Sequence, residues 1–333
     1  MTSTSTPQTF IYKTASQNNS GAKVEIPLDV YLPIQKHQRP PKPLIWIHTG
    51  GFLQGTRKFL PPHFQRACNR LNLALITPDY RLAPQVNIEG VLDDVKDCIR
   101  FTLSSEGLSA KLGGGKSSLD TSQYILAGSS AGGWASLLQG LGFTDSKDIP
   151  APLAVIAIYP ITTINKARAP YYHMPLKPLP WAYNLQAQIG DLVPVEPLKP
   201  HMDKDGEVLT EAPPLVLTSR APLYSYARQE GIYPDLILAK GQNAEQYCLP
   251  TLIERSGKTG TKDTNTKLVF VAYGDADPMV EIHQSKEVIE ALKKANLPYD
   301  IGTYVEPGKS HLWDILDPEA DIPELWQKVE KVL

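Results

Sequence analysis

The segment of residues 124–134, with the sequence YILAGSSAGGW, most constrains what this chain can fold into. An apolar run of strand type ends in the pattern Gly-x-Ser-x-Gly, and small residues then lead into a helix-like stretch. This pattern is typical of a sharp strand-to-helix turn that lifts the hydroxyl group of its central residue, Ser130, clear of the sheet edge. Glycine is expected at Gly128 and Gly132 because a Cβ atom there would collide with neighbouring backbone. So short a pattern also arises by chance, so other parts of the chain must support it.

Composition places the chain among ordinary globular proteins. Its 333 residues are 42% hydrophobic and 20% charged, enough for one large domain or two smaller ones. The net charge of −2 gives no electrostatic reason to expect nucleic acid or an anionic membrane as a partner. No run of about 18 apolar residues occurs, so no membrane span is expected. The first nine residues lack the apolar and basic regions of a secretory signal.

The cysteines and the glycine-rich loop indicate neither a metal nor a cofactor. Cys68, Cys98 and Cys248 are too widely separated for a metal-ligand pattern or a disulfide framework, and we expect buried, reduced thiols in a cytoplasmic protein. Residues 113–118 superficially resemble a phosphate-binding loop but lack its leading strand and its spacing. No feature of the sequence indicates an oligomeric state.

Strand-like and helix-like segments alternate along most of the chain, which predicts a mostly parallel central sheet with helices on both faces. The first two strands should form a hairpin whose turn lies at residues 18–21. The strands besides the one before Ser130 are predicted at residues 10–15, 23–32, 44–47, 73–77, 153–159, 267–273 and 299–305. The helices are predicted at residues 66–72, 88–103, 131–141, 282–295 and 322–332.

The alternation breaks between residues 162 and 264, where proline and aromatic residues are frequent and periodicity is weak. A structureless segment of that length is improbable inside a compact domain. We therefore expect an inserted cap at 162–264, with short helices near 180–189, 223–229 and 244–254. Residues 1–161 and 265–333 would then form the catalytic domain.

Four motifs follow predicted strands: residues 48–51, Ser130, Asp277 and His311. Reactive groups in open α/β sheets lie at the carboxyl ends of the strands, so these motifs should meet at one edge. A serine needs a base within hydrogen-bond reach, and the base needs a carboxylate to orient it. The sequence thus predicts Ser130 as nucleophile, His311 as base and Asp277 as the acid. Asp275 is expected to be a turn residue or a supporting partner.

An oxyanion hole requires backbone N–H groups that face the developing negative charge. Gly50 and Gly51 can expose their amides because no side chain blocks the approach, and the amide of Ala131 would add a third donor. His48 is expected to brace this loop and not to react. Tyr80 and Arg81 are expected to be structural, and Ser129 is expected to carry a solvent-facing or locally bonded hydroxyl group.

Together these motifs resemble the hormone-sensitive-lipase-like, or fold-3, branch of the α/β-hydrolases. The segments that carry the resemblance are HTGGF (48–52), DYRLAP (79–84), GSSAGG (128–133), DPM (277–279) and His311. The resemblance implies an α/β-hydrolase fold, a serine esterase, the triad Ser130, Asp277 and His311, and Gly50, Gly51 and Ala131 as oxyanion donors.

The sequence departs from that branch at two site positions. Thr49 replaces the first glycine of the family's His-Gly-Gly-Gly pattern, and Ser129 stands where the family usually has aspartate. The opening of the chain, residues 12–33, is similar to fungal members, some of which serve small-molecule biosynthetic pathways.

The leading hypothesis is a serine hydrolase that cleaves a carboxylic ester or lactone of a mid-sized hydrophobic small molecule through an acyl-enzyme. An amidase, such as a formamidase, is an alternative, although Phe52 replaces the tryptophan of the formamidase pattern. An isomerase or cyclase using the same triad is a further alternative. A non-catalytic ligand binder on this fold is the last, and the presence of His311 weighs against it.

Overall fold

A single eight-stranded sheet forms the centre of the molecule, in the order β1-β2-β4-β3-β5-β6-β7-β8. The structure is a computed structural model that describes residues 5–17, 22–35, 37–113, 118–213, 220–259 and 265–333. The strands are β1 (Gln8–Ser16), β2 (Lys23–Tyr31), β3 (Lys42–Ile47), β4 (Leu73–Pro78), β5 (Ile125–Ser129), β6 (Ala154–Ile158), β7 (Leu268–Gly274) and β8 (Asp300–Glu306). Strand β2 is antiparallel to β1 and to β4, and all other neighbours are parallel. The predicted mostly parallel sheet is confirmed.

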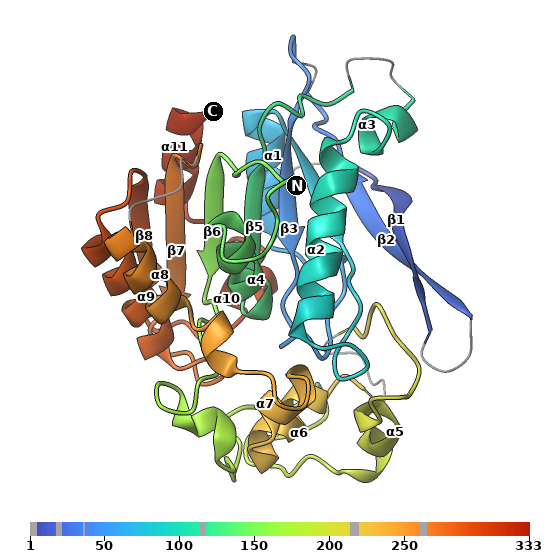
Figure 1. Cartoon of the computed structure of the whole chain (residues 1–333), viewed down its shortest axis with the longest axis vertical. Helices are drawn as coiled ribbons and strands as arrows, with labels where there is room; N and C mark the ends of the chain where they lie inside the picture. The colour runs from blue at the N-terminus through green and yellow to red at the C-terminus, as the bar shows by residue number, and fades with distance from the viewer. Residues whose placement is uncertain (1–4, 18–21, 36, 114–117, 214–219, 260–264) are drawn as a thin grey trace.

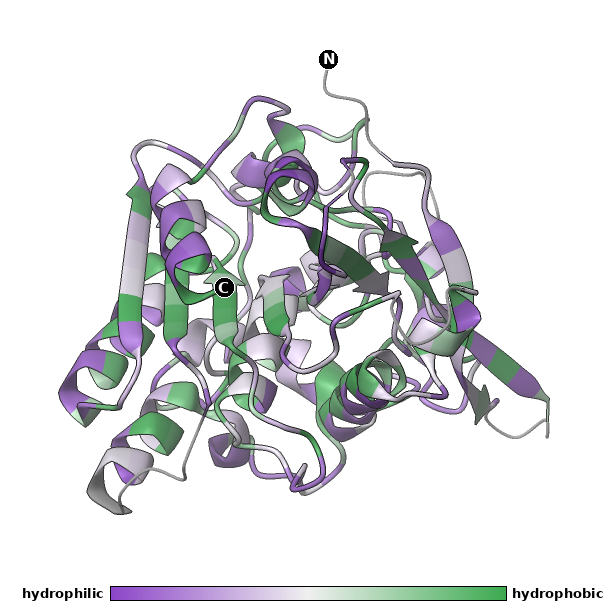
Figure 2. Cartoon of the chain, turned by 90° about the horizontal axis from the view of Figure 1, so that it is seen from above, coloured by the Kyte–Doolittle hydropathy of each residue, from purple (hydrophilic) through white to green (hydrophobic). Residues whose placement is uncertain are grey.

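The inner strands β4 to β7 are apolar because helices cover both faces of the sheet. Every residue of β4, β5, β6 and β7 is buried. Figure 2 shows these hydrophobic strands in the interior, surrounded by helices that also carry hydrophilic residues.

The flanking helices form two layers. On one face, α2 (Ile88–Leu103) contacts α4 (Ala131–Gly140), and α9 (Ile282–Ala295) packs on β7. On the other face, α1 (Pro62–Leu71) meets α11 (Pro323–Val332), where the rings of Phe64 and Trp326 lie 4.8 Å apart. The short helices α3 (Leu108–Lys111) and α10 (Trp313–Leu316) complete this part of the fold. None of the helices in the described ranges is both long and apolar enough to cross a bilayer.

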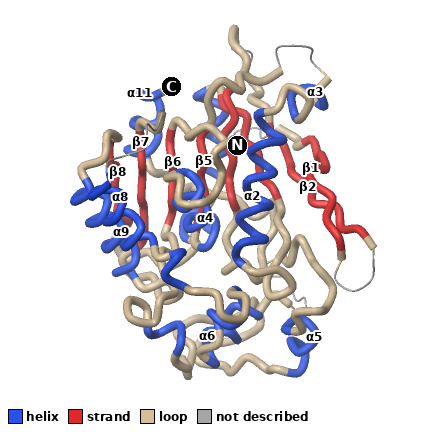
Figure 3. The backbone as a smooth tube through the Cα atoms, viewed as in Figure 1, coloured by secondary structure: helices blue, strands red, loops and turns tan. Residues whose placement is uncertain are grey.

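Most of the chain between β6 and β7, which we call the insertion, lies beyond the end of the sheet (Figure 1). It is mostly loop with short helices, as Figure 3 shows. Its helical elements are η2 (Pro170–His173), η3 (Glu196–Leu198), α5 (Lys199–Met202), α6 (Leu223–Glu230), α7 (Tyr233–Ile237), η4 (Ala244–Tyr247) and α8 (Leu249–Thr259). Helix α8 packs against α9 at the side of the sheet.

Hydrogen bonds join the insertion to the loop that follows β3. Gly55 and Ala212 exchange two backbone hydrogen bonds, of 2.7 and 2.8 Å. The buried guanidinium group of Arg220 donates to the carbonyl oxygens of Leu53 and Ala83 and to the side chain of Gln85. The insertion is therefore attached directly beside the segment of residues 48–52.

The helix expected at residues 180–189 is absent. The side chain of Asn184 accepts hydrogen bonds from the backbone N–H groups of Gln186 and Ala187, both at 2.8 Å. Such local bonds satisfy the backbone in a turn and compete with a helix. The helix expected at 244–254 is divided at Cys248 into η4 and α8. The predicted turn at residues 18–21 and most of the loop at 113–118 lie outside the described residues.

Candidate active site

Ser130 lies on a sharp turn between β5 and α4, as the sequence predicts. Its φ and ψ angles are +55° and −120°, a conformation that L-residues rarely adopt. A Cβ atom on Gly128 would lie 2.4 Å from the carbonyl oxygen of Gly132, and one on Gly132 would lie 2.1 Å from that of Ile47. Both glycines are needed because the helix passes so close to the two strands.

Asp277 and His311 are in direct contact. The Nδ1 atom of His311 donates to Oδ2 of Asp277 at 2.6 Å, and both side chains are almost fully buried. The other carboxylate oxygen accepts from the amides of Met279 and Val280, at 2.8 and 3.0 Å. Since an ionised carboxylate only accepts hydrogen bonds, the imidazole proton is on Nδ1, which leaves Nε2 able to accept a proton.

Asp275 has a different role. Its carboxylate accepts from the amide of Gly308 at 2.5 Å and lies at the surface. It therefore fixes the turn that leads to His311, and the structure brings Asp277, not Asp275, to the histidine.

The loop that follows β6 links Ser130 to His311. The amide of Ser130 donates to the carbonyl oxygen of Ile158 at 2.9 Å, and the amide of Ile161 donates to the carbonyl oxygen of Ser130 at 3.1 Å. Tyr159 lies between Ile158 and Ile161 in the chain. Its ring packs on the imidazole of His311, with 4.5 Å between the ring centroids. Ser130 and the Asp277–His311 pair thus both adjoin this one loop at the carboxyl edge of the sheet.

Backbone strain is concentrated at this edge. Apart from Asn72 and Asn296, which end helices, the described non-glycine residues with positive φ angles are Phe52, Ser130, Tyr159 and Leu312, all at or next to this site. Such conformations each cost of order 1–3 kcal/mol and are maintained only where the surrounding structure holds them, as at active sites.

The candidate oxyanion loop is shaped by two glycines. Gly50 and Gly51 have φ angles of +119° and +65°, and a Cβ atom on Gly51 would lie 2.4 Å from the ring of Tyr224. The hydroxyl group of Tyr233 donates to the carbonyl oxygen of Gly51 at 3.2 Å. Ala131 is the first residue of α4, so its amide has no acceptor within the helix.

His48 braces this loop from inside the protein, as expected. Its Nδ1 atom lies 2.7 Å from the carbonyl oxygen of Thr49, and its ring is stacked on Tyr80 at 4.1 Å. The hydroxyl group of Tyr80 donates to the carbonyl oxygen of His48. Burial lowers the pKa of His48 to about 4, so the imidazole is neutral near neutral pH.

Ion pairs hold the chain segments that adjoin this loop. Arg57 binds Asp29 and Asp79, and burial raises the pKa of Asp79 to about 7 although Arg57 acts in the opposite direction. Arg81 forms an ion pair with the buried Asp94, which agrees with the structural role expected for it.

Next to His311 lies a buried polar network that the sequence did not predict. The hydroxyl group of Tyr159 donates to the carboxylate of Asp314, whose other oxygen lies 3.5 Å from Nε2 of His63. Burial, followed by the charge of Asp314, raises the pKa of Tyr159 well above its usual value. The only local signal is an acidic residue within the apolar run at residues 312–316.

For Ser129, the structure excludes the first of the two expected alternatives, a solvent-facing hydroxyl group. Its side chain is fully buried and lies beside Tyr159, so the hydroxyl group does not face solvent. At this position the strand is enclosed on both faces, which leaves room for serine but no contact with water.

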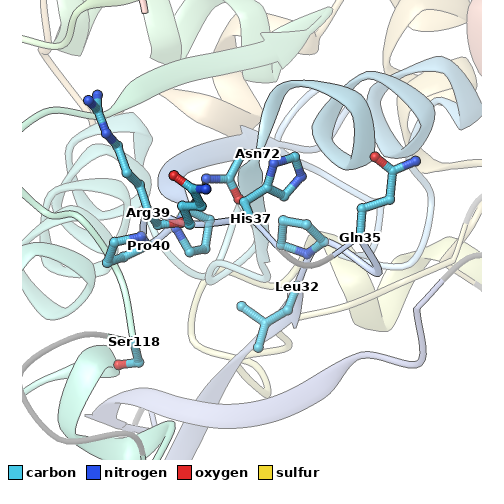
Figure 4. A pocket seen from close by; sticks show the side chains of 10 residues that line it. Leu32, Gln35, His37, Arg39, Pro40, Asn72 and Ser118 are labelled. Atoms are coloured by element: carbon cyan, nitrogen blue, oxygen red, sulfur yellow. Dashed lines mark hydrogen bonds between the residues drawn. The ribbon is translucent and has the colours of Figure 1, made fainter.

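A cavity of about 480 Å³ lies at the opposite edge of the sheet (Figure 4). It is lined by residues such as Arg39 and Asn72, which precede β3 and β4. Because six-residue strands span roughly 20 Å, this cavity is far from Ser130. Within the described ranges, no three His, Cys, Asp or Glu side chains are grouped so that they could hold a metal ion.

Comparison with known proteins gives a consistent result. A family model described as alpha/beta hydrolase fold matches residues 44–220, more than half of the chain. The crystal structure of carboxyl esterase 2 from the fungus Tuber melanosporum superposes with a TM-score of 0.58 at 15% identity, covering 99% of this chain and 87% of that one.

Two relatives match in part. Over 152 residues, 45% of this chain, the sequence is 29% identical to the non-reducing polyketide synthase ascC of Acremonium egyptiacum. Over 112 residues, 33% of this chain, it is 31% identical to arylacetamide deacetylase-like 2 of Homo sapiens. These matches cover only 7% of the synthase and 26% of the deacetylase-like protein.

Proposed function

Since the chain belongs to the α/β-hydrolase family, we propose that it is a serine hydrolase that cleaves a carboxylic ester or lactone of a mid-sized hydrophobic molecule. The observation that carries the proposal is the buried 2.6 Å hydrogen bond between His311 and Asp277, at the same edge of the sheet as the strained turn of Ser130. The fold shared with a fungal carboxyl esterase supports the esterase assignment.

The proposed reaction begins with attack of the Ser130 hydroxyl group on the ester carbonyl carbon. Nε2 of His311 accepts the hydroxyl proton and later gives it to the leaving alcohol. Asp277 holds the imidazole in the required tautomer and stabilises its charged form. The amides of Gly50, Gly51 and Ala131 bind the oxyanion of the tetrahedral intermediate. Water then hydrolyses the acyl-enzyme by the reverse sequence of proton transfers.

We further propose that residues 162–264 act as a cap over the serine. In support, Tyr224 and Tyr233 of the insertion contact the backbone of Gly51, and the hydroxyl group of Tyr224 donates to the carbonyl oxygen of Met279 at 3.1 Å. These residues would bind the acyl group. The relationship to part of a polyketide synthase favours an acyl group of polyketide origin.

Labelling with a fluorophosphonate probe, together with assays on nitrophenyl esters of increasing acyl length, tests the proposal. We expect the wild-type protein to be labelled and to hydrolyse at least one ester, and Ser130→Ala to lose both properties. Ser129→Ala is the matched control, because it removes the neighbouring hydroxyl group and should remain labelled. If the wild-type protein is not labelled and cleaves no ester, the proposal is wrong.

Amide hydrolysis is the second candidate, favoured by the partial match to an arylacetamide deacetylase-like protein. The same triad can attack an amide carbonyl group, provided that His311 protonates the leaving amine. Comparison of aryl acetates with the matching arylacetamides distinguishes the two activities. A higher kcat/KM for the amide would replace the esterase proposal with an amidase.

A further inference from the structure

Arg228 is a buried cation without an ion-pair partner among the described residues. Its side chain is 2% exposed, and its Nε and Nη1 atoms have no hydrogen-bond partner. Arg220, in the same insertion and equally buried, has all three of its nitrogens bonded to oxygen atoms. Burying polar N–H groups without acceptors costs free energy, so the difference between the two arginines calls for an explanation.

Two tyrosine rings surround the guanidinium group. Its central carbon lies 4.5 Å from the ring centroid of Tyr172 and 5.1 Å from that of Tyr171. Cation–π contacts of this kind stabilise a buried charge but provide no oxygen acceptor for the N–H groups. A carboxylate supplies two oxygen atoms with the spacing that matches two guanidinium N–H groups.

Packed tyrosine rings connect the guanidinium group to the candidate oxyanion loop. Tyr224 precedes Arg228 by one turn of α6, so both side chains lie on the same face of this helix. The ring of Tyr233 packs 5.3 Å from that of Tyr224 and 5.0 Å from that of Tyr172, and its hydroxyl group donates to Gly51. A continuous cluster of tyrosines therefore joins Arg228 to the segment beside Ser130.

We propose that Arg228 is a carboxylate-binding subsite, so that the preferred ester carries a free carboxylate remote from the bond that is cleaved. This inference rests on the proposed esterase function for its kinetic consequence but not for the binding itself. The carboxylate would accept from Nε and Nη1 of Arg228, and the tyrosine rings would flank the hydrocarbon or aromatic part of the substrate.

Paired substrates test the subsite kinetically. The first pair is the 4-nitrophenyl monoester of glutaric acid and its terminal carboxamide; the second is 4-acetoxybenzoate and 4-acetoxybenzamide. We expect the wild-type protein to prefer the carboxylate in at least one pair by tenfold or more in kcat/KM. Arg228→Met should reduce that ratio at least tenfold, and Arg228→Lys should retain part of it.

Arg168→Met is the matched control, because Arg168 is a partly exposed arginine paired with Glu254 and Glu287. This variant removes the same charge and should keep the wild-type ratio. If neither pair shows a preference, or if Arg228→Met lowers kcat/KM equally for both members of each pair, Arg228 has only a structural role and the proposal is wrong.

Calorimetric titration of benzoate into Ser130→Ala protein separates this proposal from the proposed function. Binding that Arg228→Met weakens at least tenfold in the same background supports the subsite even if no ester is hydrolysed. Failure to bind benzoate, in protein whose circular dichroism and Tm match the wild type, overturns the subsite and leaves the esterase proposal unaffected.

Discussion

Asp277 receives hydrogen bonds from one imidazole and two backbone amides, which fix the carboxylate in one orientation. Asp277→Asn would keep the side-chain shape but offer an N–H group to His311, favouring the wrong tautomer. On the ester that the wild-type protein hydrolyses, we expect kcat to fall by about 10³- to 10⁴-fold. Asp275→Asn is the control, since the carboxylate of Asp275 accepts from the turn amide of Gly308 and lies away from His311 at the surface. A smaller loss in Asp277→Asn than in Asp275→Asn would reverse the two assignments.

The buried histidine of the oxyanion loop predicts how stability depends on pH. His48 has a pKa of about 4 in the folded protein, whereas an unfolded histidine titrates near 6.5. The unfolded chain therefore binds a proton first as the pH falls. The contribution of His48 to the free energy of unfolding should therefore decrease as the pH falls from about 6.5 to 4, by about 3 kcal/mol at most, whereas Asp79, whose pKa is raised to about 7, contributes in the opposite direction.

Urea titrations of wild-type and His48→Asn protein across this pH range measure how much His48 contributes to the pH dependence of the free energy of unfolding. Asparagine retains an N–H donor for the carbonyl oxygen of Thr49, and we expect it to reduce the slope of stability against pH. His37→Gln, which removes an exposed histidine, is the control and should keep the wild-type slope. Equal slopes in wild type and His48→Asn would contradict the prediction.

Single residues differ in how far the sequence reveals their roles. Ser130, Asp277 and His311 each follow a strand with a local motif, so the sequence places them at one sheet edge. Tyr159 and Asp314 come from distant segments and have no characteristic spacing, so their contact could not be predicted. Nothing in the sequence indicates that Arg228 lacks hydrogen-bond acceptors among the described residues, because that depends on which groups the fold places beside it.

Among the secondary-structure elements, the sequence predicts a helix well where it contains a capping residue and a helical period of apolar residues. Helix α2 has the predicted bounds because Asn87 caps its first turn by accepting from the amide of Gly90, and its apolar residues follow a helical period. At residues 180–189 the side chain of Asn184 forms a turn that the hydrophobic pattern does not reveal.

We expect Arg220 to contribute strongly to the attachment of the insertion beside the oxyanion loop. Arg220→Met keeps most of the side-chain volume but leaves the carbonyl oxygens of Leu53 and Ala83 and the side chain of Gln85 without this donor. We expect the free energy of unfolding to decrease by about 2–4 kcal/mol in urea titrations. Arg168→Met should change it by less than about 1 kcal/mol, as is usual for exposed ion pairs. Similar values for the two variants would show that the attachment does not depend on Arg220.

For the whole molecule, the sheet and the insertion should differ in local stability. Strands β5 and β6 are buried along their length, whereas the insertion consists of short helices joined by loops. In hydrogen–deuterium exchange, we expect amides of β5 and β6 to exchange last and those of α5 to exchange through local opening of lower free energy. Arg220→Met should accelerate exchange in the insertion more than in the strands. Uniform exchange would indicate that the insertion unfolds only with the sheet.

The neighbours β6 and β7 are 110 positions apart, from Ile158 to Leu268, with the whole insertion between them. During translation, β5 and β6 leave the ribosome long before the strands that carry Asp277 and His311. At about 5–20 residues per second, about 10 to 35 seconds pass between the synthesis of Ser130 and that of His311. The nascent chain therefore holds a serine that cannot yet react, and any reactivity appears only when synthesis has passed His311.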